Sequence, residues 1–360
     1  MNKRGRRHNN DYEEDRLSDL PDCVLLHIMS FLKTKYAVQT CILSKRWKNL
    51  WKHLPILTLY SSNFKVVSKI LSHSTALQAL NFYPLGFMVH PRLLKYIILY
   101  TLSRNVKQLE INLLCDVQHL PRCLFSSQLL THLHLSVCRP NRDDITLFPN
   151  SLNMPALTKL SLRNFVFCVG DDGRVEPFSS CNKLNTLIIE KCQVVDKQNL
   201  CISSTTLVNL KIISWYNPPE ASFKFELSTP SLCNFYFRGT PLQKLRGSKI
   251  NLSSIKHVDF GVGLNSADSP LVLFNWLVEL GNIESLTLSY STLQVLSSIP
   301  DLLKIEFPSL RNLKSLKVKS FVPLCSIPVF RISADFLLQN SPSAEGSKYK
   351  HTLLMDYFFS

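Results

Sequence analysis

Cysteine and histidine side chains gather in one stretch of the chain, where they could bind a metal. They are Cys115, His119, Cys123, His132 and His134. A zinc site needs Cys and His ligands that converge on one point, and the first three are four residues apart, as on one face of a helix. Pro121 would break a helix that aligned them. We therefore expect no metal at this position.

Paired acids could supply general acid–base chemistry, and two such pairs occur, Asp143–Asp144 and Asp171–Asp172. A catalytic pair needs burial and a partner that separates the two pKa values. Both pairs lie in loops containing proline or glycine, so solvated turns are the better interpretation. The sequence contains no catalytic triad motif, no G-x-G-x-x-G and no P-loop. We expect no catalytic residues, no enzyme activity and no cofactor.

The composition is typical of a folded chain in a reducing compartment. Its 360 residues are 45% hydrophobic and 10% aromatic, enough to bury a substantial core. The 11 cysteines include no C-x-x-C pair, and the polar N-terminus does not resemble a signal peptide. No apolar run approaches the roughly 18 residues that a membrane span needs, so we expect no membrane partner.

The net charge of +15 is compatible with an acidic partner, a nucleic acid or a phosphorylated ligand. Basic residues are spread along the chain, with one dense cluster at Lys3, Arg4, Arg6 and Arg7. The cluster resembles a minimal nuclear-import patch, and a solvated tail is an equally good interpretation. We expect the protein in the nucleus, the cytoplasm or both.

One pattern, apolar-x-x-apolar-x-apolar, recurs through most of the chain. Its copies begin at residues 77, 106, 130, 157, 184, 207, 232, 255, 283 and 313. The intervals of 23 to 30 residues are close to the leucine-rich repeat period of about 20–29 residues. The alternation predicts a short strand with one buried face, and stacking of such strands predicts a curved solenoid with a parallel sheet on its concave side.

The segments between the predicted strands are irregular and not uniformly helical. PLVLFNWLVELG (270–281) has helical spacing and a glycine to end it, so a helix is expected there. NFVF (164–167) and KCQVV (191–195) extend the apolar pattern, and we expect them to turn the chain over the edge of the core. Within the second, Cys192 is expected to be a buried turn residue.

The residues between the apolar positions of each strand point outward, onto the concave surface. In the middle repeats they include four cations and a tyrosine: Lys159, Arg163, Lys211, Tyr236 and Arg238. This set suits an acidic peptide or a phosphorylated group. An exposed strand face is polar in any case, so the set could also have no ligand. Recognition of a target protein along the face is favoured, because solenoids bind partners on their concave surfaces.

The segment before the repeats has the pattern of three short helices. Apolar residues between Leu20 and Leu32 recur at helical spacing, and Pro21 suits the first turn. A second helix is expected over Ala37–Ile42 and a third over Lys45–Trp51. Three short helices form a marginal core, so such a unit gains stability by packing on a partner.

CILSKRWKNLW (41–51) forms the end of this unit and combines cations with two tryptophans. Ser44 is a suitable N-cap for the third helix, and Trp47 and Trp51 then lie on one face. The helix could read nucleic acid, belong to the core or dock on a protein. The tryptophans favour the protein interface, and the cations Lys45, Arg46, Lys48 and Lys52 are expected to form a solvated edge.

The N-terminal segment resembles the F-box motif, especially as it occurs in plants. The matching residues are Leu17, Leu20-Pro21, Ile28, Phe31-Leu32, Leu43-Ser44-Lys45-Arg46-Trp47 and Leu50-Trp51. Together with the repeats, they make the whole chain similar to the plant F-box/leucine-rich-repeat proteins. Many members continue into a further C-terminal domain, which we expect to be absent or reduced to a remnant here.

The resemblance implies a substrate-recognition subunit of a Skp–cullin–F-box ubiquitin ligase. Its F-box would dock on the Skp-type adaptor, its repeats would hold a target protein, and a separate conjugating enzyme would transfer ubiquitin. The residues that the resemblance assigns to adaptor binding are Leu20, Pro21, Ile28, Leu32, Leu43, Trp47 and Leu50. Two alternatives stay open: a nucleic-acid-binding protein that uses the basic N-terminal helices, and an adaptor-binding scaffold without degradative function.

The expected fold is α/β, with an N-terminal three-helix F-box followed by a curved leucine-rich-repeat solenoid that has a parallel β-sheet on its concave face. The expected units are a disordered basic tail (1–15), the F-box (16–56), a solenoid of about ten repeats (57–340) and a C-terminal tail (341–360).

Overall fold

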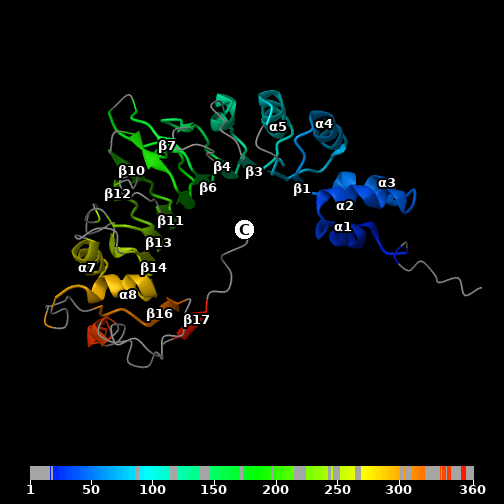
Figure 1. The fold of residues 1–360 in the computed structure, drawn as a ribbon. Helices are drawn as coiled ribbons and strands as arrows, with labels where there is room; N and C mark the ends of the chain where they lie inside the picture. Colours follow the sequence, from blue (N-terminus) through cyan, green and yellow to red (C-terminus); the bar gives the residue numbers. More distant parts are fainter. Residues whose placement is uncertain are drawn as a thin grey trace, which may run out of the picture.

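A computed structural model describes residues 17, 19–85, 89–113, 120–137, 146–170, 173–195, 198–214, 224–241, 245, 252–263, 269–300, 304, 310–320, 333, 335–337, 339–341 and 350–353. The chain forms an α/β structure in which helices come first and a long curved sheet follows (Figure 1). Among the described residues, no helix is long and apolar enough to cross a membrane.

The N-terminal unit consists of short helices and 3-10 turns. Its elements are α1 (Asp22–Ser30), α2 (Thr34–Gln39), η1 (Thr40–Ile42), α3 (Trp47–Leu50) and η2 (Trp51–His53). Pro21 lies immediately before α1, where its fixed φ and missing N–H suit a helix start. The third helix is shorter than the expected Lys45–Trp51, and its N-cap is Arg46 and not Ser44 as predicted. The Ser44 hydroxyl lies 3.5 Å from the backbone N–H of Trp47, the first residue of α3.

A parallel sheet with twelve strands in the described residues continues from this unit. Its order along the sheet is β1 (Ile56–Leu59), β2 (Ala79–Phe82), β3 (Gln108–Leu113), β4 (His132–Val137), β6 (Lys159–Arg163), β8 (Thr186–Glu190), β11 (Asn209–Ser214), β13 (Asn234–Gly239), β14 (His257–Val262), β15 (Ser285–Ser289), β16 (Ser315–Ser320) and β17 (Lys350–Leu353). The strands line the inner side of an arc, with α4, α5 and α7 on its outer side (Figure 1).

Every predicted repeat copy forms one strand of this sheet, and two further strands extend it at the ends. The first, β1, follows the same pattern at Leu54, Leu57 and Leu59, 23 residues before the first predicted copy. The repeat signal therefore begins inside the segment that was expected to belong to the helical unit alone. The second, β17, lies in the segment that was expected to be a tail.

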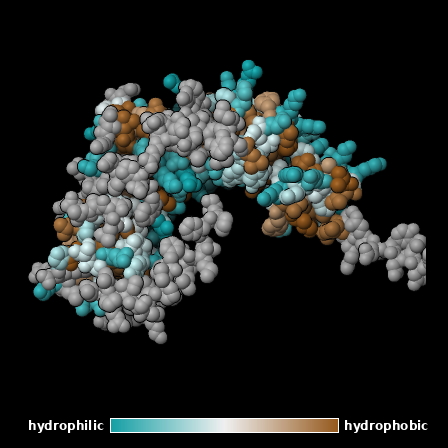
Figure 2. All heavy atoms as spheres, viewed as in Figure 1, coloured by the Kyte–Doolittle hydropathy of each residue, from teal (hydrophilic) through white to brown (hydrophobic). Residues whose placement is uncertain are grey.

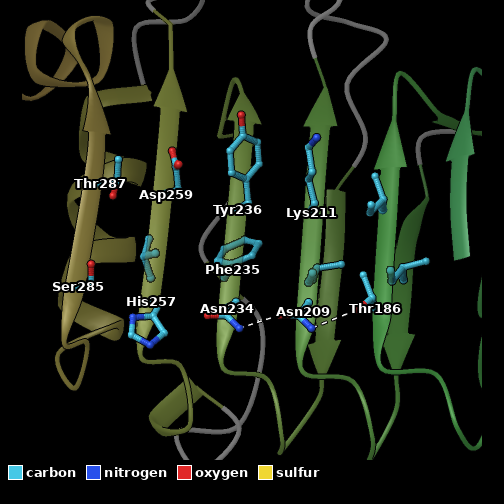
Figure 3. Close-up of a pocket in the computed structure, with 14 residues that line it drawn as sticks. Thr186, Asn209, Lys211, Asn234, Phe235, Tyr236, His257, Asp259, Ser285 and Thr287 are labelled. Atoms are coloured by element: carbon cyan, nitrogen blue, oxygen red, sulfur yellow. Dashed lines mark hydrogen bonds between the residues drawn. The ribbon is translucent and has the colours of Figure 1, made fainter. Parts of the chain in front are cut away.

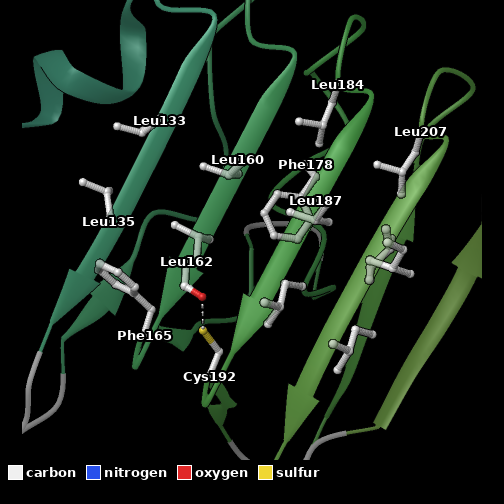
Figure 4. Close-up of a cluster of buried hydrophobic side chains, with 14 of the residues drawn as sticks. Leu133, Leu135, Leu160, Leu162, Phe165, Phe178, Leu184, Leu187, Cys192 and Leu207 are labelled. Atoms are coloured by element: carbon white, nitrogen blue, oxygen red, sulfur yellow. Dashed lines mark hydrogen bonds between the residues drawn. The ribbon is translucent and has the colours of Figure 1, made fainter. Parts of the chain in front are cut away.

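Two columns of buried apolar side chains run across the sheet, one residue per strand in each column. Leu133, Leu160 and Leu187 belong to one column and Leu135, Leu162 and Ile189 to the other, and all six are at most 1% exposed (Figure 4). A single strand pair could not bury these side chains. Stacking of the strands buries them, and each Å² of apolar surface removed from water stabilises the ladder by about 25 cal/mol.

Helices occupy several of the segments between the strands in the described part of the chain. They are α4 (Phe64–His73), α5 (Pro91–Ser103), η3 (Arg122–Ser126), α7 (Ser269–Glu279) and α8 (Tyr290–Ser297). The expected helix at 270–281 is thus confirmed as α7. The helices α4 and α5 were not predicted, and their N-caps are Asn63 and His90.

Short strands also form on the outer side of the repeats. One three-stranded sheet contains β5 (Leu147–Phe148), β7 (Val166–Phe167) and β9 (Gln193–Val194), and a strand pair contains β10 (Asn199–Ser203) and β12 (Lys224–Ser228). The apolar extensions after β6 and β8 therefore turn over the core, as predicted. Cys192 is fully buried there, with its thiol 3.7 Å from the carbonyl oxygen of Leu162 (Figure 4).

Candidate functional site

Exposed apolar side chains gather on the N-terminal helices. We call them the N-terminal apolar surface, and they are Leu17, Val24, Ile28, Phe31, Leu32, Ile42 and Leu43. Ile42 is 85% exposed, Phe31 76% and Leu43 63%, values that a monomer seldom tolerates for several large side chains on one small unit. Figure 2 shows hydrophobic side chains massed over this end of the arc. Clustered exposed apolar side chains of this kind are typical of protein-interaction surfaces.

The interior of the same unit is a separate set of side chains. Leu25, Met29 and Ala37 are completely buried, and Trp47 and Trp51 are 5% and 8% exposed. The sequence left open which tryptophan faces outward, and in the structure both belong to the core. The Trp51 ring also lies 6.4 Å from the His73 ring of α4, which joins the helical unit to the first repeat.

The residues assigned to adaptor binding by resemblance divide between surface and core. Ile28, Leu32 and Leu43 are exposed together with Pro21, whereas Leu20 is partly buried against the core. Trp47 and Leu50 are buried. The assignment omitted two of the most exposed side chains, Phe31 and Ile42. Phe31 is part of the matching motif, but no pattern in the sequence indicated that Ile42 would be exposed.

Arg46 connects the two ends of the helical unit. Its Nε and Nη2 atoms lie 2.8 and 2.5 Å from Oδ1 of Asp22, and Nη2 also donates to the carbonyl oxygen of Leu20. The prediction that Arg46 belongs to a solvated edge is therefore wrong, because its guanidinium binds residues at the start of α1. The α3 helix spans only four residues, so it offers little length for reading a nucleic-acid groove.

The second candidate surface is the inner side of the twelve-stranded sheet. Each strand places alternate side chains on this side, and the parallel register aligns them in rows. In one row, Ser161, Ile188, Lys211, Tyr236 and Asp259 lie on consecutive strands. The register thus brings together side chains that lie 23 to 27 residues apart in sequence. All five predicted target-binding residues lie on this inner face.

Tyr236 lies between two of the predicted cations. The Lys211 ammonium is 5.3 Å from the centroid of the tyrosine ring, and the Arg238 guanidinium carbon is 5.1 Å from it. Lys211 also forms an ion pair with Glu190 at 3.1 Å. Gly261 leaves room for Arg238, since a Cβ at this glycine would lie 2.8 Å from the arginine Cγ. The three side chains form one packed polar group.

The acids of this face lie beside basic side chains. In addition to Glu190, Asp259 accepts from Lys319 at 2.7 Å, and Glu110 lies 3.8 Å from Nε2 of His134. Lys159 and Arg163 have no ion-pair partner within the described part of the chain. These two cations are therefore available to a ligand, whereas Lys211 would have to exchange its partner.

Two histidines next to these cations have lowered pKa values. Burial is the main cause for both His132 and His134, because it disfavours the charged imidazolium. Lys159 lowers both pKa values further, while Glu110 and Glu190 partly oppose the effect on the pKa of His134. Both side chains line a hollow of about 360 Å³ over β3, β4 and β6.

A second hollow of about 360 Å³ lies over β8 to β15 (Figure 3). Amide side chains cross it as a ladder, in which Asn234 donates to Asn209 at 2.7 Å and Asn209 donates to Thr186 at 3.1 Å. Tyr236 and Lys211 stand beside this ladder in the same view. The hollow combines an aromatic ring, a cation and amides, which are groups that contact peptides.

Two residues of the Cys and His group that was weighed as a zinc site, Cys115 and His119, lie outside the described residues. The acidic pairs at 143–144 and 171–172 lie outside them too. Among the residues that are described, no group of three or more His, Cys, Asp or Glu side chains could hold a metal ion.

Comparison with known proteins supports the resemblance found in the sequence. Residues 17–59 match the F-box domain family. A putative F-box/LRR-repeat protein of Arabidopsis thaliana is 26% identical over 359 residues, covering 96% of this chain and 73% of that protein. An F-box/FBD/LRR-repeat protein of the same plant is 26% identical over 336 residues, covering 86% and 72%. A third, a putative F-box/LRR-repeat protein, is 30% identical over 221 residues, covering 56% and 50%.

Proposed function

We propose that this F-box protein, similar over most of its length to plant F-box/LRR-repeat proteins, is the substrate-recognition subunit of a Skp–cullin–F-box ubiquitin ligase. The N-terminal apolar surface docks on the Skp-type adaptor, and the repeats form a solenoid that binds a target protein on its inner face. The observation that carries the proposal is the set of highly exposed apolar side chains on the part of the chain that matches the F-box domain.

Adaptor binding is assigned to the exposed members of the surface. Phe31, Ile42 and Leu43 offer large apolar side chains that bury well in a partner's pocket, which is where binding energy concentrates. Pro21, Ile28 and Leu32 complete the contact. Trp47 and Leu50, which the resemblance included, are buried in the helical unit and stabilise it. They support adaptor binding only by holding the helices in place.

Target binding is assigned to the inner face of the sheet. Lys159 and Arg163 have no ion-pair partner in the described part of the chain, and Tyr236 stands between Lys211 and Arg238. An acidic or phosphorylated segment of the target would pair with these cations in a partly desolvated setting, where charge-assisted hydrogen bonds are strong. The receptor holds and orients the target, and the ubiquitin-conjugating enzyme of the cullin complex transfers ubiquitin to it.

We place this assembly in the nucleus or the cytoplasm. The possible import cluster at residues 3–7 lies outside the described residues. An adaptor-binding scaffold without degradative function would make the same adaptor contact and would differ only in the fate of the protein that it captures. Accumulation of a captured target when the proteasome is inhibited distinguishes the ligase receptor from the scaffold.

The adaptor assignment is tested by co-purification of the full chain with a plant Skp-type adaptor. Replacing Phe31 and Ile42 with serine should lower adaptor binding by about thirtyfold or more, since truncating even one hot-spot side chain costs about 2 kcal/mol or more. Leu271→Ser is the matched control, because Leu271 is 59% exposed on α7, far along the arc. If the Phe31/Ile42 variant binds the adaptor as tightly as the parent, the N-terminal apolar surface is not the adaptor-binding site.

A further inference from the structure

A hollow of about 710 Å³ lies where the helical unit meets the first repeat, and none of its lining residues belongs to the N-terminal apolar surface or to the predicted target-binding set. Its walls come from α2, from the end of β1 and the turn after it, and from α4. In Figure 1 these three elements meet at the N-terminal end of the arc. The volume is about twice that of either hollow on the inner face, and it lies in the range of small-molecule pockets.

The walls of this junction hollow are mostly apolar and partly open to water. Tyr36 is 52% exposed, Val66 45% and Leu85 70%, and all three line the hollow. Val67 and Ile70 of α4 lie deeper. Exposed apolar side chains do not stabilise a monomer, and their presence around an open hollow of this size is typical of a binding site.

Two cations stand at the junction hollow, and none of its described lining residues is acidic. They are Lys33 and Lys35, and neither has an ion-pair partner in the described part of the chain. The Lys33 ammonium lies 5.7 Å from the centroid of the Tyr60 ring, directly over an aromatic wall. The N-terminus of α4 is not the anion site, because Asn63 already accepts from the N–H groups of Lys65 and Val66.

We propose that the junction hollow binds a small amphipathic organic anion. An aromatic or aliphatic body fills the space between Tyr36, Tyr60 and Val66, and a carboxylate-like or sulfonate-like head group pairs with Lys33 and Lys35. The charge complementarity and the apolar lining together define this ligand class. Because the walls belong to α2 and α4, the ligand would join the helical unit to the repeats. The proposal does not depend on adaptor or target binding.

The experiment compares two fluorescent probes with the same aromatic body on the full chain. The anionic probe is 8-anilinonaphthalene-1-sulfonate, and the neutral one is N-phenyl-1-naphthylamine. We expect the anionic probe to bind at one site per chain, about tenfold more tightly than the neutral probe. The double variant Lys33→Gln/Lys35→Gln should remove most of this difference, since each partly exposed ion pair contributes up to about fivefold.

Three controls assign the binding to the junction hollow. Val66→Trp fills the space and should abolish binding of both probes, with an unchanged circular dichroism spectrum. The double variant Lys65→Gln/Lys69→Gln removes an equal charge on α4 outside the hollow and should bind the anionic probe as the parent does. Phe31→Ser removes an exposed ring from the other apolar surface and should also have no effect.

The proposal is overturned if the two probes bind equally, or if the lysine variants bind like the parent. It is also overturned if the full chain binds no anionic probe, as expected where another part of the chain or a partner fills the hollow. If Val66→Trp does not fold, the lysine variants and their matched control still decide the outcome.

Discussion

Arg46 and Asp22 form an ion pair across 24 residues of sequence, with the guanidinium Nη2 2.5 Å from the carboxylate Oδ1. The same nitrogen donates to the carbonyl oxygen of Leu20, so one side chain holds the start of α1 against the start of α3. The basic motif 41–51, for which nucleic-acid reading was one interpretation, thus contains an arginine that stabilises the helical unit itself.

Replacing Arg46 with alanine should lower the free energy of unfolding of the helical unit by about 1 kcal/mol. Asp22 is 62% exposed, so the ion pair itself contributes about 0–1 kcal/mol, and the bond to the Leu20 carbonyl adds a similar amount. Arg46→Lys should recover only part of this, because an ammonium cannot place two donors on one carboxylate oxygen while also reaching the carbonyl. Urea unfolding of both variants measures the effect.

A double-mutant cycle with Asp22→Ala separates the ion pair from the carbonyl contact. If the two single changes add without interaction, the ion pair does not stabilise the unit.

Replacing Trp47 with alanine should cost about 3–5 kcal/mol of stability, because a large side chain that is 5% exposed leaves a cavity when it is truncated. Phe31→Ala should change stability by no more than about 0.5 kcal/mol, since Phe31 is 76% exposed. Denaturant unfolding, followed by tryptophan fluorescence in the Phe31 variant and by circular dichroism in both, checks the contrast.

The same two positions distinguish core from interface in adaptor binding. Trp47→Phe should keep most of the stability and bind the adaptor, whereas Phe31→Ala should fold normally and bind weakly. A stable Trp47→Phe variant that has lost the adaptor would place Trp47 in the contact after all.

The repeat strands were predictable because each depends on a local pattern. Leu133, Leu135 and their equivalents recur within six residues, so each copy predicts a strand with one buried face, and the regular repeat predicts that the strands stack in parallel. The strand β1 had the same pattern in Leu54, Leu57 and Leu59 and was missed because the pattern begins at Leu54, inside the segment 16–56 that was assigned to the F-box. The local spacing of apolar residues was thus enough to predict most strands of the main sheet.

The pairing of charges on the inner face was not predictable in the same way. Lys211 and Glu190 lie on neighbouring strands, and their contact depends on the register and on side-chain rotamers that no single strand specifies. The division of the N-terminal residues between surface and core has the same origin. Ile42 and Trp47 are both apolar, and only the packing of short helices sends one into water and the other inward.

Acidification should destabilise the repeats through His132 and His134. Burial lowers the pKa of both imidazoles below the ordinary value near 6.5, so the folded state prefers them neutral. Below about pH 6.5 the unfolded chain takes up protons that the folded chain resists, and stability falls as the pH drops through the folded pKa values. The stability is fully present above about pH 6.5.

Urea unfolding at pH 7.5 and 5.5 measures this effect. The His132→Gln/His134→Gln variant should lose less stability between the two pH values than the parent. His257→Gln, a change on the same face, supplies the background slope against which the difference is read. A double variant with the parent's slope would show that other groups cause the pH dependence.

Alkylation should distinguish the buried thiols from the exposed ones. Burial raises the pKa of Cys181 to about 11, so little thiolate forms near pH 8, and its side chain is also closed to reagent. Cys192 is fully buried and lies within 3.7 Å of two carbonyl oxygens. Cys23 and Cys123 are exposed. With iodoacetamide at pH 8, mass spectrometry should find Cys23 and Cys123 modified first, and Cys181 and Cys192 only after urea is added. Equal rates for Cys181 and Cys23 in the native protein would show that the repeats open locally around Cys181 faster than the reagent reacts.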